Sequence, residues 1–162
     1  ELFADLGILD ERFVAVHATN LADHEVALMG KARAFACICP TTERDLGDGL
    51  GPIAALRAAG ARLCTGIDSH VITDPIDDLR SLETHERLRT RTRVTFSPTD
   101  GTTPAEQLWH EGSIAGELAC GFQDKAEKVS ISREHPALHL VKEEGLIDAI
   151  VFSGNASLFQ RT

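Results

Sequence analysis

An aspartate and a histidine follow two separate apolar runs of this sequence, at positions that favour shared chemistry. Asp68 comes directly after the run 61–67, and His17 ends the earlier run 13–16. If both runs are parallel strands, their carboxyl ends meet at one rim of an α/β fold, where such folds place their catalytic residues. A carboxylate can bind a divalent ion and take a proton from water, while an imidazole can stabilise developing charge. The pair therefore predicts metal-assisted hydrolysis.

Each candidate residue also has a simpler structural explanation. A single histidine at a strand end is more often a hydrogen-bonded structural residue, and a single aspartate before a helix is most often an N-cap. His70 could be a ligand or part of an exposed polar loop. Glu43 and Arg44 could pair with each other or recognise a charged substrate. On residue type alone, these alternatives stay open.

The elements that must position these residues alternate along the chain. Short apolar runs predict three strands, at residues 13–17, 35–39 and 61–67. Capped or amphipathic patterns predict the intervening helices, at residues 25–34, 52–59 and 74–89, the last with Asp74 as its cap. This repeat, with a period of roughly 25 residues, predicts the α/β class with a parallel sheet, in a (β/α)₈ barrel or an open doubly wound sheet.

The remaining segments are less regular. The polar, glycine-containing stretch 41–51 indicates a loop, and 104–120 a helix broken near Gly112 and Gly116. Residues 129–131 and 149–152 are candidate short strands. The charged residues of the helix at 74–89 are expected to form a solvated face; they are Glu83, His85, Glu86 and Arg87.

Composition narrows the class of partner and the compartment. A net charge of −9 argues against nucleic acid or an anionic membrane as the main partner, since both attract basic patches. No apolar run approaches the roughly 20 residues of a membrane span. The first residues show no signal-peptide pattern, and the absence of an initiator methionine suggests that the chain does not start at a native start codon.

The four cysteines are expected to be buried free thiols of a cytoplasmic protein, because no pair is well placed for a disulfide. They are Cys37, Cys39, Cys64 and Cys120. The Cys37-x-Cys39 pair could hold a soft metal, but no second pair with zinc spacing accompanies it.

Three motifs together resemble the amidohydrolase superfamily. They are Val-His-Ala-Thr at 16–19, Cys-Pro-Thr-Thr-Glu-Arg-Asp-Leu-Gly-Asp-Gly at 39–49, and Gly-Ile-Asp-Ser-His at 66–70. Within the superfamily, the second motif is most similar to that of the formimidoylglutamate deiminases of histidine degradation. The similarity continues over residues 83–90.

The resemblance implies a fold, a metal and roles for two residues. The family is a (β/α)₈ barrel with a mononuclear zinc, so residues 1–120 would form the C-terminal part of the barrel, with strands six to eight. Residues 121–162 would be a poorly defined extension, a candidate remnant of a small β-domain. His17 would contact the substrate or the attacking water. Asp68 would bind zinc and shuttle the proton.

The sequence also departs from the family. Its His-x-His and His-x-x-Glu motifs, which supply the other zinc ligands and a glutamate, are absent and are expected before Glu1. A histidine is expected where Asn20 stands, and 123–141 does not match. We therefore expect a fragment of a deiminase-like hydrolase that releases ammonia, is inactive alone and binds zinc poorly.

Two alternatives remain, and both follow from the missing ligands. The chain could be a degenerate, non-catalytic relic kept for binding, or it could derive from a different amidohydrolase, acting on cytosine, guanine or a triazine. In each case three strands cannot close a barrel, so an open sheet edge would remain. That edge should associate with a missing N-terminal half or with a second copy.

Overall fold

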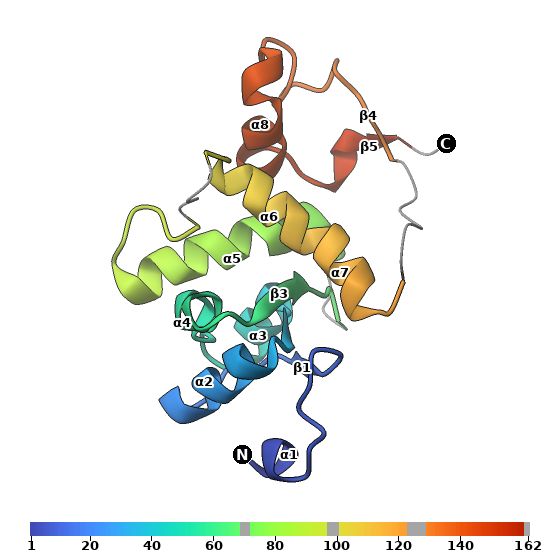
Figure 1. Ribbon diagram of the computed structural model, residues 1–162. Coiled ribbons are helices and arrows are strands. Elements are labelled where there is room, and N and C mark those ends of the chain that lie inside the picture. The colour runs from blue at the N-terminus through green and yellow to red at the C-terminus, as the bar shows by residue number, and fades with distance from the viewer. Residues whose placement is uncertain (69–71, 97–100, 123–128, 161–162) are drawn as a thin grey trace.

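The computed structural model describes residues 1–68, 72–96, 101–122 and 129–160. A parallel sheet in the order β1-β2-β3 lies between helices (Figure 1). Its strands are β1 (Val14–Val16), β2 (Phe35–Ile38) and β3 (Arg62–Thr65). Each was predicted within a few residues, and the α/β class is confirmed.

The described residues also form eight α-helices. They are α1 (Leu2–Asp5), α2 (Asp23–Ala32), α3 (Pro40–Leu46), α4 (Ile53–Ala59), α5 (Pro75–Thr90), α6 (Pro104–Gly112), α7 (Ile114–Ala119) and α8 (Leu146–Ser153). Two 3₁₀ turns, η1 (Glu143–Gly145) and η2 (Ala156–Leu158), flank α8. Within the described ranges no helix is both long and apolar enough to cross a bilayer.

One face of the sheet is buried against helices. Ala36 and Ile38 of β2 belong to the main apolar cluster, which also includes Val26 of α2 and Leu56 of α4. Helices α2 and α4 approach so closely that a Cβ on Gly30 would overlap the backbone of Ala59. This face of the sheet is therefore closely packed against the helices.

The other face of the sheet is only partly covered. Phe35 and Cys64 form a small cluster with Ala115 of α7. The guanidinium of Arg62 lies 3.7 Å from the centre of the Phe35 ring. Val16, in the edge strand β1, is 56% exposed. The sheet thus has one helix-covered face and one that is still partly open.

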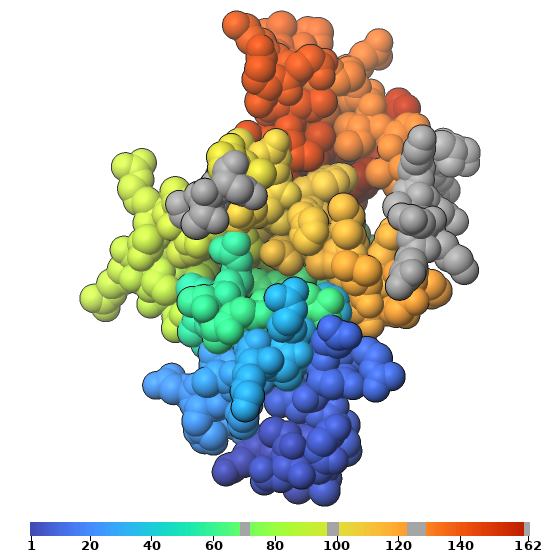
Figure 2. All heavy atoms as spheres, in the orientation of Figure 1, coloured from blue at the N-terminus to red at the C-terminus, as the bar shows by residue number. Residues whose placement is uncertain are grey.

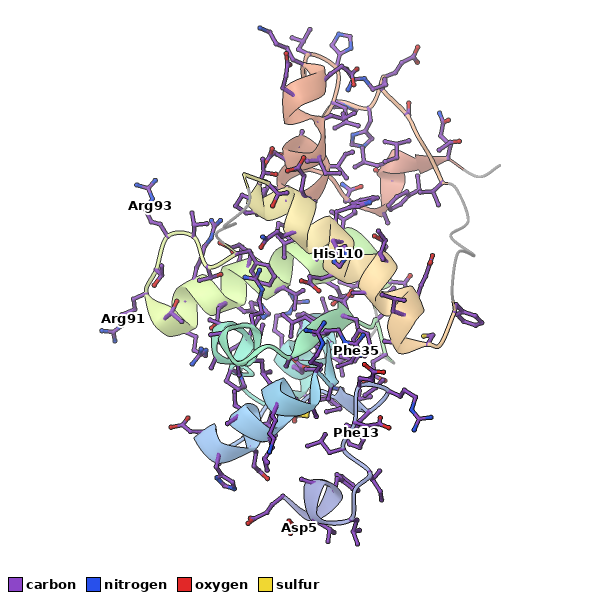
Figure 3. The ribbon with its side chains drawn as sticks, in the orientation of Figure 1. Asp5, Phe13, Phe35, Arg91, Arg93 and His110 are labelled. Carbon is purple, nitrogen blue, oxygen red and sulfur yellow. The ribbon has the colours of Figure 1, made fainter. Side chains whose placement is uncertain are left out.

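The N- and C-terminal parts of the chain lie at opposite ends of the molecule (Figure 2). Phe13 and Phe35 lie at the sheet, whereas Arg91 and Arg93 point outward from the turn after α5 (Figure 3). All four cysteines are free thiols, as predicted. Cys39 and Cys64 are buried, but Cys37 is half-buried and Cys120 is exposed, so the prediction of burial is wrong for Cys120.

Residues 40–46 form helix α3 and not the loop that their polarity predicted. Pro40 starts the helix at its first turn, where its missing N–H costs nothing. Gly47 ends it with a φ of 72°, in the left-handed region that glycine adopts without strain. The polar side chains of Thr41, Thr42 and Glu43 are buried because they bind neighbouring elements, as described for the site below.

The C-terminal segment differs in part from expectation. Residues 149–152 lie inside α8, not in a strand, since Ile150 and Val151 pack on the cores formed with α5 and α6. A short apolar run cannot be assigned to strand or helix by periodicity alone. The other candidate strand is confirmed: β4 (Ser130–Ile131) pairs antiparallel with β5 (Phe159–Gln160).

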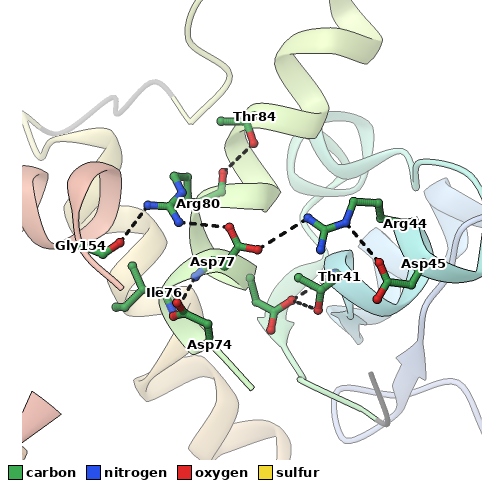
Figure 4. A network of polar contacts seen from close by, with 10 residues as sticks. Thr41, Arg44, Asp45, Asp74, Ile76, Asp77, Arg80, Thr84 and Gly154 are labelled. Carbon is green, nitrogen blue, oxygen red and sulfur yellow. Dashed lines mark hydrogen bonds and ion pairs between the residues drawn. The ribbon is translucent and has the colours of Figure 1, made fainter. Parts of the chain in front are cut away.

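A polar network attaches α3 and α8 to α5 (Figure 4). Arg80 donates to the carbonyl of Gly154 at 3.0 Å and to Asp77 at 3.1 Å. Asp77 also lies 3.6 Å from Arg44 of α3. The N-cap of α5 is Asp74, as predicted, and its carboxylate accepts from the backbone N–H of Ile76. These contacts hold the first half of α5 against α3 and the end of α8.

The charged part of α5 is not a solvated face. Glu83 and Glu86 are 0% and 1% exposed. Glu83 accepts hydrogen bonds from the backbone N–H groups of Thr95 and Phe96 and from Arg87. The prediction was wrong because the backbone donors, Thr95 and Phe96, lie in a later segment, which the helix pattern does not reveal. Burial alone would raise the pKa of Glu83, but these hydrogen bonds outweigh it and lower that pKa.

Replacing Glu83 with glutamine should destabilise the protein by about 2–4 kcal/mol at neutral pH, because donors lose their charged acceptor. Because the pKa of Glu83 is lower in the folded than in the unfolded state, its ionised carboxylate stabilises the fold above about pH 4.3. That contribution is lost as the pH falls through the folded-state pKa. The deficit of Glu83→Gln relative to wild type should therefore shrink below about pH 4 in urea unfolding.

The exposed residue Glu134 offers a matched control. Glu134→Gln should change the free energy of unfolding by less than about 0.5 kcal/mol at either pH. An equal deficit for Glu83→Gln at neutral and acidic pH would contradict the assigned role of its charge.

Candidate functional site

The carboxyl ends of the three strands converge on one rim. The backbone N–H of His17 donates to the carbonyl of Cys37 at 2.8 Å, continuing the ladder beyond β1. Gly66 likewise donates to Ile38 at 3.1 Å beyond β3. Because parallel strands all end at the same edge, these bonds place the residues after β1, β2 and β3 together.

Three potential metal-ligating side chains meet there, one from each strand end. His17 Nε2 lies 3.7 Å from Asp68 Oδ2. A nitrogen of His17, the Sγ of Cys39 and a carboxylate oxygen of Asp68 all lie within 4.8 Å of one another. The His17 and Asp68 side chains are each 36% exposed, and Cys39 is buried. We call this set the rim triad.

Two members of the rim triad have strained backbones. His17 has a φ of 68° and Asp68 a φ of 56°, and Ala18, next to His17, has a φ of 54°. The left-handed conformation costs a non-glycine residue roughly 1–2 kcal/mol. Such strain persists where the surrounding structure enforces it, often at functional sites. Here both strained turns aim their side chains at the same point.

Glu43 connects two members of the triad. Its side chain is 3% exposed, and its Oε1 accepts the backbone N–H of Cys39 at 2.9 Å. The same oxygen lies 3.4 Å from His17 Nδ1. Burial raises the pKa of Glu43, while the contacts with Cys39 and His17 oppose that rise. A carboxylate behind the imidazole orients the ring, so that Nε2 faces Asp68.

Two threonines next to Glu43 attach α3 to the segment after β3 and to α5. Thr42 donates to the carbonyl of Ile67 at 3.2 Å, directly before Asp68. Thr41 donates through its hydroxyl to Asp78 of α5 at 2.7 Å. Both threonines are buried. We call Thr41, Thr42 and Glu43 the α3 tether, since each binds a different neighbour.

The structure brings some predicted site residues together and separates others. His17 and Asp68 face each other, and the N-cap of α5 is Asp74, so Asp68 does not cap that helix. Glu43 faces His17, whereas Arg44 contacts Asp45 and Asp77. They do not form the pair considered from the sequence. His70 lies outside the described residues.

Sequence reasoning considered Cys39 only as half of a soft-metal pair with Cys37, and Glu43 only beside Arg44. It missed that Cys39 lies next to His17 and Asp68, and that Glu43 supports the site from inside. The available signal was position, since Cys39 follows β2 as His17 follows β1. Imidazole nitrogen, thiolate sulfur and carboxylate oxygen are all ligands of zinc, so the donor set fits that ion. The hydrogen bond with Cys37, burial and the nearby carboxylates raise the pKa of the Cys39 thiol. Metal binding there would therefore release a proton.

Parallel strands with a histidine, a thiol and a carboxylate at one rim define an α/β protein with a candidate metal centre. No family model matches the chain. It is 34% identical to the formimidoylglutamate deiminase of Pseudomonas aeruginosa over 153 residues, which cover 90% of this chain and 34% of that enzyme. The chain is homologous to formimidoylglutamate deiminase, and the predicted resemblance to the amidohydrolase superfamily is confirmed.

A second relative is a 5-methylthioadenosine/S-adenosylhomocysteine deaminase of Moorella thermoacetica. It is 24% identical over 161 residues, covering 94% of this chain and 36% of the enzyme. The chain spans about a third of the length of the curated relatives it matches. These homologues are deaminases and deiminases.

Solved structures give the same fold. An amidohydrolase from Brucella melitensis matches with a TM-score of 0.79 and 28% identity, over 98% of this chain and 36% of that one. An adenosine deaminase from Xanthomonas campestris with bound zinc matches with a TM-score of 0.82 and 18% identity, over 98% of this chain and 37% of that one. The second likeness supports the fold alone.

The α3 tether makes a testable prediction for Glu43. Glu43→Ala leaves the buried N–H of Cys39 without its acceptor and should lower the free energy of unfolding by about 2–3 kcal/mol. Glu43→Gln keeps an acceptor oxygen at nearly the same place and should lose less than about 1 kcal/mol. Urea unfolding at neutral pH measures both. Equal losses would mean that the charge, and not the acceptor, holds Cys39.

Proposed function

We propose that β1, β2 and β3 are strands six, seven and eight of a (β/α)₈ barrel. Residues 1–120 then form the C-terminal part of the barrel, and 121–162 an extension beyond it. Support comes from the parallel order of the sheet and the match to the Brucella amidohydrolase. The partly open face of the sheet fits a barrel interior, which other strands would close.

The activity that this site supports best is hydrolysis of a C–N bond of the imine or amidine type. Water adds to the carbon, the C–N bond breaks, and ammonia leaves while a carbonyl forms. The observation that carries this proposal is the opposition of His17 Nε2 and Asp68 Oδ2 at 3.7 Å on the rim. Formimidoylglutamate is the proposed substrate, because the deiminase relative shares 34% identity with this chain.

The two residues take complementary roles in the proposed reaction. Asp68 accepts a proton from the attacking water and passes it to the departing nitrogen. His17, held from behind by Glu43, contacts the substrate or the attacking water and stabilises developing charge. Both side chains are partly exposed, so a small substrate can reach them.

Zinc is the proposed cofactor of the complete enzyme, with Asp68 as one ligand. A zinc ion supplies Lewis acidity that makes hydroxide available near neutral pH. The Xanthomonas adenosine deaminase, which has the same fold, contains bound zinc. Further ligands of the family would come from strands one and five, outside the three strands of this sheet.

The proposed partner is the rest of the barrel, in a cytoplasmic setting that keeps the thiols reduced. Among the described strands, β1 pairs only with β2, so its other edge is open for a further strand. Exposed apolar side chains gather on and before β1; they are Leu2, Phe3, Leu6, Ile8 and Val16. Self-association through the same surface is the competing outcome.

A chimera tests the proposal, with residues 1–162 in place of the aligned third of the Pseudomonas aeruginosa enzyme. It should release ammonia from formimidoylglutamate, whereas the 162-residue chain alone should not. His17→Ala and Asp68→Asn should each lower kcat at least ~100-fold, because each removes a group that moves or stabilises charge. His24→Ala, at a 61% exposed histidine of α2, should retain the rate.

Circular dichroism of each chimera separates a folding failure from a catalytic one. Turnover of guanine, cytosine or a triazine, without turnover of formimidoylglutamate, would contradict the proposal that formimidoylglutamate is the substrate. A folded chimera without any turnover would favour the non-catalytic relic. Turnover by the isolated chain, abolished by His17→Ala, would overturn its predicted inactivity.

A further inference from the structure

We propose that Cys39 is a metal ligand, and that the rim triad binds one zinc-type cation through sulfur, nitrogen and oxygen. The inference takes its location from the proposed hydrolase site. It adds a donor that the sequence suggested only as a pair with Cys37, and that the comparisons do not assign. Metal binding tests it without any assay of hydrolysis. This proposal departs from the expectation that the chain alone binds zinc poorly, because that expectation counted Asp68 as the one ligand present.

The spacing of the donor atoms suits a tetrahedral ion. With bonds of about 2.0–2.3 Å, donors around zinc lie about 3.3–3.6 Å apart. His17 Nε2 and Asp68 Oδ2, at 3.7 Å, are already close to that separation. The Sγ of Cys39 lies within 4.8 Å of both partners, so these separations need to shorten by about 1.3 Å at most. Rotations of the partly exposed His17 and Asp68 side chains can supply such a shift.

The backbone around Cys39 is arranged to present its thiol to the rim. The N–H of Cys39 is fixed by Glu43, which also lies behind the His17 ring. Opposite the thiol stands Gly66, where a Cβ would lie 3.3 Å from the Sγ atoms of both Cys37 and Cys39. The absence of a side chain at Gly66 thus leaves the thiols their room. In metal sites, a ligating imidazole is commonly oriented by a carboxylate on its other nitrogen, as Glu43 is placed here.

The donor chemistry selects the kind of ion. A thiolate and an imidazole favour zinc or cobalt over magnesium and calcium, which prefer oxygen ligands. On binding, the Cys39 S–H bond breaks, the sulfur donates its electron pair to the cation, and the proton leaves to solvent. Three protein donors leave a fourth position open to solvent, as in zinc sites that bind water.

Titration of the metal-free full chain with Zn²⁺ and Co²⁺ tests the inference. We expect one equivalent to bind, an excess of Mg²⁺ not to compete, and the cobalt complex to show thiolate-to-metal charge-transfer absorption. X-ray absorption of the zinc complex should find one sulfur at about 2.3 Å. Cys39→Ser should abolish the charge-transfer band and weaken binding at least ~10-fold.

Two matched variants keep the test specific. Cys37→Ser, in β2 two residues before Cys39, and Cys64→Ser, in β3, should both retain the band and the affinity. Loss of the band in either control but not in Cys39→Ser would overturn the proposal, as would a zinc complex without sulfur in the wild-type chain. The latter needs no variant, so a misfolded Cys39→Ser protein does not weaken the test.

The outcomes for metal binding and for hydrolysis are separable. An active chimera combined with a sulfur-free metal complex would reject Cys39 as a ligand and leave the proposed function standing. A sulfur-bound metal in the chain, with a folded but inactive chimera, would support Cys39 as a ligand and reject the proposed function.

Discussion

The geometry of the rim depends on one buried carboxylate oxygen. Glu43 Oε1 accepts the N–H of Cys39 and lies behind the imidazole of His17, so it holds the ends of β1 and β2 together. Burying this group is unfavourable for its charged form, and its pKa is raised for that reason. The hydrogen bond to Cys39 offsets part of that cost. The remaining members of the α3 tether attach the same helix to β3 and α5.

This arrangement explains which features the sequence could predict. The three strands were recognisable because apolar runs in parallel sheets are buried on both faces, and the cap at Asp74 because its carboxylate binds local N–H groups. In contrast, α3 was missed because its polar residues are satisfied by partners from distant segments. Glu83 was misjudged for the same reason, since its donors Thr95 and Phe96 lie beyond the helix.

The site shows the same division between local and long-range information. That His17 and Asp68 follow strands could be inferred from the sequence, and parallel pairing then requires their proximity. Cys39 follows β2 in the same way, but it was not assigned to the triad because it ends an apolar run and so resembles a core residue. Its role depends on the bond from Glu43 and on the room left by Gly66, which are visible only in three dimensions.

The composition of the rim triad also separates metal binding from catalysis. A thiolate and a carboxylate together carry two negative charges, which neutralise a divalent cation, whereas Asp68 alone leaves it with a net positive charge. A neutralised ion attracts electrons from water less strongly, so it lowers the pKa of that water less. Binding by all three donors would therefore favour retention of the ion over activation of water.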